Sequence, residues 1–97
     1  MTGSVTRVRA GPGDDLAALV RAAPPGSLLV LIDPASDALA AAQARAAIGP
    51  LAAERAPERV NALAPAADAH PDDVEAAARF LGAARSTTGQ VLEVGAR

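Results

Sequence analysis

The last third of the chain, from Arg59 to Arg97, limits the possible folds more than any other stretch. It reads as a short apolar strand over residues 59–65, a helix from Pro71 to about Leu81, and a second strand over residues 88–95. Two short strands joined through a helix are typical of a β-α-β unit in a parallel sheet. Such units are right-handed in nearly all proteins. We therefore predict a right-handed crossover here.

The helix of this unit is well specified by its residues. Pro71 suits the first helical position, and Asp72 and Asp73 lie where the helix dipole favours negative charge. Gly82 is a suitable stop. The apolar residues fall on one helical face with the spacing i, i+3, i+4, i+7: Val74, Ala77, Ala78 and Leu81.

The preceding residues alternate strands and helices. Residues 5–9 alternate apolar and polar side chains, which predicts a half-exposed edge strand. A helix follows from Asp14 or Asp15 and ends before Pro24. Residues 27–32 (SLLVLI) form a continuous apolar run, as expected for a strand covered on both faces. The order predicts one α/β domain over residues 1–97: a three-layer sandwich with a small, three- to four-stranded parallel sheet, or reduced Rossmann-like fold.

The next helix, from Ala38 to about Ala56, is dominated by alanine, and Ser36 or Asp37 would cap it. Gly49-Pro50 should kink or break it near the middle. Its side chains are small on most faces. A neighbouring helix could therefore approach it closely.

The composition excludes several classes of function. Only Phe80 is aromatic, and much of the 51% hydrophobic content is alanine, so the core is modest and a partner would offset the deficit. A net charge of −2 without a basic cluster argues against nucleic acid and anionic membranes. No cysteine, signal peptide or transmembrane run is found, which favours the cytoplasm. Alanine- and arginine-rich usage without lysine suggests a GC-rich bacterial genome.

Two blocks, RVNALAP and DDVEAAARFLGAARSTTGQVLEVGAR, resemble the C-terminal end of short-chain dehydrogenases/reductases. The resemblance is good from about Leu39 onward and looser before it. It implies that the four strands correspond to the last four of that family, and that the adenine half of the dinucleotide site has no counterpart. The matching positions are Arg59, Val60, Asn61, Pro65, Val74, Phe80, Leu81, Thr88, Gly89, Gln90 and Val94.

The family transfers hydride between a nicotinamide cofactor and a carbonyl or alcohol, with a Tyr, a Lys four residues later and a Ser. The resemblance places the tyrosine at Ala40 or Ala41 and the lysine at Ala44 or Arg45. The chain contains neither residue type anywhere. The serine position is nearest Asp33 or Ser36, where helix capping is the favoured role for Ser36. We therefore predict no catalytic residues.

The sequence gives equally little support for a cofactor site or a metal site. Residues 11–15 (GPGDD) contain G-x-G between a strand and a helix, but Pro12 removes a backbone donor and two aspartates would repel phosphate. A turn with an acidic helix start is favoured. His70 is better explained as a helix cap or loop residue than as a lone base, and Asn61 as structural. Glu75 and Arg79 are spaced for an ion pair. No cofactor and no metal is predicted.

These observations predict a non-catalytic subunit that assembles with itself or with a full-length short-chain dehydrogenase/reductase, as a structural or regulatory partner of an oxidoreductase complex. An alternative is a small metabolite- or acyl-binding α/β module, with residues 33–36 and 65–70 lining the carboxyl edge of the sheet. A third is an enzyme completed by residues from a partner. The expected interface residues are Leu39, Ala42, Ala46, Arg45, Phe80, Val91, Leu92 and Val94.

Overall fold

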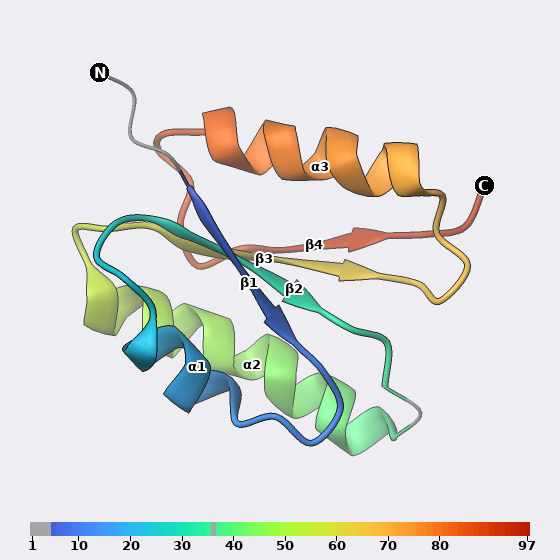
Figure 1. Cartoon of the computed structure of the whole chain (residues 1–97), viewed down its shortest axis with the longest axis horizontal. Coiled ribbons are helices and arrows are strands. Elements are labelled where there is room, and N and C mark those ends of the chain that lie inside the picture. The colour runs from blue at the N-terminus through green and yellow to red at the C-terminus, as the bar shows by residue number, and fades with distance from the viewer. Residues whose placement is uncertain (1–4, 36) are drawn as a thin grey trace.

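The computed structural model describes residues 5–35 and 37–97 and confirms the predicted α/β fold. Four parallel strands lie in the order β1-β2-β3-β4. Helices α1 and α2 cover one face of this sheet and α3 covers the other, which gives three layers (Figure 1). The elements are β1 (Thr6–Ala10), α1 (Leu16–Ala22), β2 (Leu28–Ile32), α2 (Ala38–Arg55), β3 (Val60–Pro65), α3 (Pro71–Ala83) and β4 (Val91–Val94).

The core lies on both faces of the two central strands, β2 and β3. Leu28 and Val30 on β2 pack toward α1 and α2, whereas Leu29 between them packs toward α3. This alternation explains the unbroken apolar run in the sequence, because both sides of the strand are covered. β1 is an edge strand with alternating exposure, as predicted.

The three connections between strands do not share one hand. Each steps to the next strand in the same direction across the sheet, yet α3 lies on the face opposite α1 and α2. In Figure 1, β1 is nearest the viewer and the strands point to the right. The connections below the sheet are then right-handed, and the one above it, through α3, is left-handed. The predicted right-handed crossover is wrong, because the periodicity of α3 specifies an apolar stripe but not which face it covers.

Helix α2 is continuous, so the predicted interruption at Gly49-Pro50 does not occur. A proline inside a helix costs about 3 kcal/mol through the lost hydrogen bond and the steric clash of its ring. Core side chains on both sides of Pro50 offset this cost, because Ile48 and Leu51 are buried against the sheet while the proline itself is exposed. Before residue 48, no residue of α2 is fully buried.

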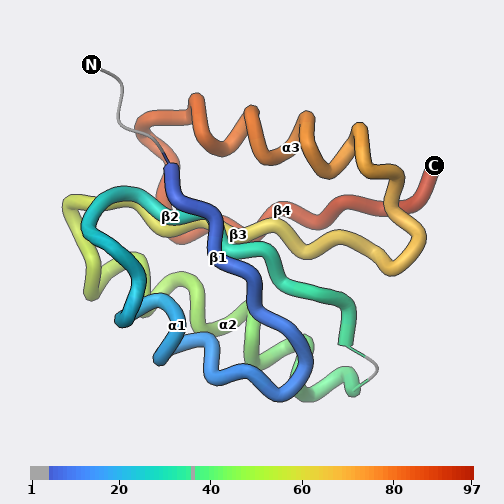
Figure 2. The backbone as a smooth tube through the Cα atoms, in the orientation of Figure 1, coloured from blue at the N-terminus to red at the C-terminus, as the bar shows by residue number. Residues whose placement is uncertain are grey.

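Helix α3 begins as predicted and ends later than predicted. His70 is its N-cap, and the imidazole Nδ1 accepts a hydrogen bond of 3.1 Å from the backbone N–H of Asp72. At the other end the helix continues through Gly82 to Ala83. The backbone trace in Figure 2 shows the C-terminal segment beyond β4 near the start of α3, where Arg97 pairs with Asp73 at 3.0 Å.

The arginine of the RVN block explains the late end of α3. Arg59 donates from its guanidinium to the carbonyl oxygens of Leu81, Gly82 and Ala84, at 3.1, 3.2 and 2.9 Å. The last carbonyls of a helix have no partner within it. A side chain that satisfies three of them allows the helix to pass the glycine that was predicted to stop it.

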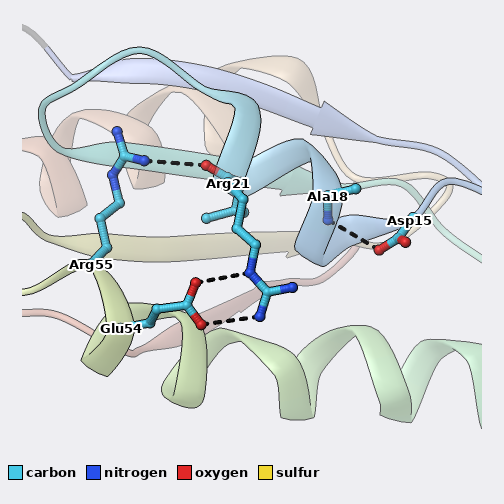
Figure 3. Close-up of polar contacts among 6 residues, drawn as sticks. Asp15, Ala18, Arg21, Glu54 and Arg55 are labelled. Carbon is cyan, nitrogen blue, oxygen red and sulfur yellow. Dashed lines mark hydrogen bonds and ion pairs between the residues drawn. The ribbon is translucent and has the colours of Figure 1, made fainter.

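Arginine side chains also join α1 to α2 (Figure 3). Arg21 on α1 forms a two-bond ion pair with Glu54 on α2, at 2.8 and 3.0 Å. Arg55 donates to the carbonyl oxygens of Val20, Pro24 and Gly26, and so holds the loop between α1 and β2 against the end of α2. None of these contacts is visible in the spacing of the sequence.

Candidate functional site

The carboxyl ends of β2, β3 and β4 form the edge at which ligands of open parallel sheets bind. On the α2 side this edge encloses a hollow of about 270 Å³. Ala41 and Arg45, four residues apart on α2, both line it, together with Asp33, Pro65 and Glu93. Of the alternative positions considered for a catalytic pair, Ala41 and Arg45 are therefore the ones that face this hollow.

An ion pair occupies the position expected for the lysine. Arg45 donates to both carboxylate oxygens of Glu93 on β4, from Nε at 2.6 Å and from Nη2 at 3.0 Å, and Nη1 donates to the carbonyl of Ala41 at 3.1 Å. The hydrogen bonds from Arg45 lower the pKa of Glu93, and the same contact raises the pKa of Arg45. The positive charge of Arg45 therefore joins α2 to β4. Ala41 has no phenol whose pKa this charge could lower.

The other predicted site residues take structural roles. Ser36 lies outside the described residues, and Asp37 is the N-cap of α2. Asp33 accepts from Nε of Arg9 at 3.0 and 3.1 Å. Asn61 is 2% exposed; its amide donates to the carbonyl of Thr87 at 2.8 Å, and its carbonyl accepts from the N–H of Gln90 at 3.1 Å.

The glycine-containing segment before α1 is a turn with an acidic helix start. Asp14 accepts a hydrogen bond of 2.8 Å from the N–H of Gly11, and Asp15 caps α1 by accepting from Ala18 at 3.1 Å (Figure 3). Both carboxylates lie where a phosphate would have to bind. The segment is therefore built to close a turn, as its sequence predicts.

Glu75 does not form the predicted pair with Arg79. Instead it accepts from both terminal nitrogens of Arg7 on β1, at 2.9 and 2.7 Å. The periodicity of a helix reports neighbours within it, whereas the partner here comes from a strand 68 residues away. This contact crosses from β1 to α3 over the sheet.

The expected interface residues lie on three parts of the molecule. Leu39, Ala42 and Ala46 share the solvent-facing side of α2, and Leu39 is 65% exposed. Phe80 projects from α3 and is 64% exposed. On β4, which is an outermost strand, Val91 and Leu92 are half-buried and Val94 is buried; Arg45 is half-buried in its pair with Glu93.

Acidification should weaken the fold through the paired carboxylates. Hydrogen bonds from arginine lower the pKa of four of them in the folded state: Glu54, Asp73, Glu75 and Glu93. A lowered folded-state pKa contributes stability above the unfolded-state value, and that stability is lost as the pH falls through the folded-state pKa. We expect the thermal midpoint to be level above about pH 4.5 and to decline below it.

The measurement is thermal unfolding, followed by circular dichroism, at a series of pH values above and below about 4.5. Glu93→Gln should show a shallower decline than the parent chain, because one titrating pair has been removed. An identical decline in the variant would show that the Arg45–Glu93 pair does not contribute.

Within the described ranges, no group of three or more His, Cys, Asp or Glu residues is arranged to hold a metal ion. Among the helices described, none combines the length and apolarity needed to cross a membrane.

Comparison with known proteins identifies a family for this chain. A family model with the description SDR-like, short chain dehydrogenase-like protein, matches residues 7–94. No curated protein and no solved structure matches the chain. The match begins at β1, earlier than the resemblance read from the sequence blocks alone.

Proposed function

Because the chain belongs to the SDR-like family of short chain dehydrogenase-like proteins, we propose that it acts as a non-catalytic subunit. It assembles with a second copy of itself or with an active short-chain dehydrogenase/reductase. Its role in such a complex is structural or regulatory. The hydride-transfer chemistry is left to the partner, since these 97 residues contain no tyrosine and no lysine.

The observation that carries this proposal is the outer face of α2. An apolar stripe runs along the solvent side of the whole helix at spacings of three and four residues. An apolar face without a covering layer favours association, and small side chains let a second helix pack closely. The members of this outer α2 face are Leu39, Ala42, Ala46, Gly49, Pro50 and Ala53, all exposed.

The way α2 is attached supports the same proposal. Its buried side chains are Ile48, Leu51 and Ala52, all in the second half of the helix. The first half has no fully buried side chain and is fastened through the Arg45–Glu93 pair. A partner helix on the outer α2 face would supply the burial that the first half lacks.

The test is the oligomeric state, measured by size-exclusion chromatography with light scattering. We expect a dimer or larger species at micromolar concentration. Ala46→Glu should raise the apparent dissociation constant at least about a hundredfold, because a helix–helix contact would bury an unpaired charge. The matched control is Ala67→Glu, at another exposed alanine in the loop after β3, which should leave assembly unchanged.

A well-folded wild-type monomer at all concentrations would exclude self-assembly. Co-expression with an active reductase of the family then tests the other partner. Retention of the wild-type chain, but not of Ala46→Glu, on the tagged reductase supports hetero-assembly. Failure of both arms overturns the proposal.

A second candidate function is favoured by the hollows at the carboxyl edge of the sheet. One lies on the α2 side, with a volume of about 270 Å³, and another on the α3 side, with about 350 Å³. Volumes in this range suit a small metabolite. Thermal-shift screening of small ligands separates this candidate from assembly, because a ligand module is stabilised without a protein partner.

A further inference from the structure

The sheet face beneath α3 is only partly covered. This single helix packs on β2, β3 and β4, whereas two helices share the opposite face. Beside the first turns of α3, at the carboxyl end of β2, the uncovered part forms a hollow of about 350 Å³. Leu31 on β2, Val74 on α3, and Pro65 and Ala69 in and after β3 line it with apolar surface. We refer to it as the Leu31 hollow.

Two ion pairs from β1 border the Leu31 hollow. Arg7 donates hydrogen bonds to both carboxylate oxygens of Glu75, at 2.9 and 2.7 Å. Arg9 donates to both oxygens of Asp33 from Nε alone, at 3.0 and 3.1 Å. Both rim carboxylates are therefore already bonded to arginine. Arg9 differs, because its Nη1 and Nη2 donate to no other residue in the described part of the chain, and its side chain is 75% exposed.

Among the described residues, the polar groups still available at this rim are therefore the charged N–H donors of Arg9, which lie beside an apolar surface. A guanidinium edge pairs best with a planar carboxylate, to which it can give two parallel hydrogen bonds. An ammonium ligand would meet carboxylates whose negative charge is already balanced by Arg7 or Arg9, so its attraction to them is reduced. The chemistry on offer thus favours an anionic oxygen ligand over a cation.

We propose that the Leu31 hollow binds a small monocarboxylate with an apolar body of roughly eight carbons, a size that suits a hollow of this volume. The carboxylate lies against the Nη atoms of Arg9, and the apolar body covers Leu31 and Val74. This inference rests on the second candidate function, a small-ligand module, and is independent of assembly through the outer α2 face.

The experiment titrates the full chain with octanoate and follows backbone amide shifts by nuclear magnetic resonance. Saturable shifts are expected at Leu31, Ala66 and Val74. Arg9→Gln should weaken octanoate binding about ten- to a hundredfold, the range expected when a hydrogen bond to a charged group is lost. Asp33→Asn should tighten it, because Arg9 is then no longer neutralised.

Two controls test whether binding depends on Arg9 in particular and on the negative charge of the ligand. Arg85→Gln removes an exposed arginine outside the hollow and should leave octanoate binding unchanged. Octylamine has the opposite charge and an alkyl chain longer by one methylene group, and it should still bind at least about tenfold more weakly than octanoate.

The outcomes test the chemical class of the ligand separately from the existence of a small-ligand site. If octylamine binds at the same amides as tightly as octanoate, or if Arg9→Gln has no effect, the carboxylate assignment is overturned while a ligand module remains. If neither probe shifts these amides, the carboxylate assignment is overturned, and the thermal-shift screen decides the second candidate function separately. Assembly, measured by light scattering, stands or falls separately.

Discussion

Replacing Asn61 by leucine is expected to lower the free energy of unfolding by about 2–6 kcal/mol. The side-chain amide of Asn61 on β3 bonds two backbone groups in the segment before β4, the carbonyl of Thr87 and the N–H of Gln90. Leucine has nearly the same size but leaves both groups without a partner next to a buried position. Each buried unsatisfied group costs about 1–3 kcal/mol, and a domain has only about 5–15 kcal/mol in total.

Chemical denaturation and thermal unfolding measure this effect. For a domain of this size each kcal/mol lowers the midpoint by about 4–8 °C. Gln90→Leu is the matched control, because it removes an exposed amide from the same loop and should change stability by less than about 0.5 kcal/mol. Equal losses in the two variants would contradict a specific role for Asn61.

The second large effect is expected for Ile48→Ala. Ile48 is 0% exposed and is the most deeply buried of the three side chains that hold α2 on the sheet. Truncation of a buried isoleucine to alanine typically costs about 2–5 kcal/mol, through lost transfer free energy and the cavity that remains.

Leu39→Ala on the same helix is the control for Ile48→Ala. Leu39 is 65% exposed, so its truncation should cost less than about 0.5 kcal/mol in a monomer. Both substitutions are best compared in the Ala46→Glu background, where assembly does not contribute. If Leu39→Ala is as destabilising there as Ile48→Ala, then α2 is not held in the way the structure indicates.

The fold was predictable where one physical signal dominates a segment. The run of residues 27–32 is apolar throughout because β2 is covered on both faces, and α3 carries its stripe, its proline and its acidic first turn. The hand of the last crossover was not predictable, because neither signal says which face a helix covers. The continuity of α2 was missed because a rule about proline is local, whereas the burial of Ile48 and Leu51 is not.

The candidate site was predictable mainly in what its residues cannot do. The absence of tyrosine and lysine is a property of composition. The family resemblance left two alternatives for each position of the pair, and only the structure identifies Ala41 and Arg45 as the residues that line the hollow. The partners of the arginines were not predictable. Glu93 lies 48 residues from Arg45, and only the parallel arrangement of the strands brings that carboxylate to α2.

The open sheet has a consequence for solubility. β1 and β4 are its outermost described strands and point the same way, so β4 of one molecule is a suitable neighbour for β1 of the next. Head-to-tail addition of that kind does not close and would grow into a filament. The charged side chains of both edge strands, Arg7 and Arg9 on β1 and Glu93 on β4, are already bonded to partners within the molecule. Adding a strand at either edge would remove these charged groups from water, and that cost opposes polymerisation.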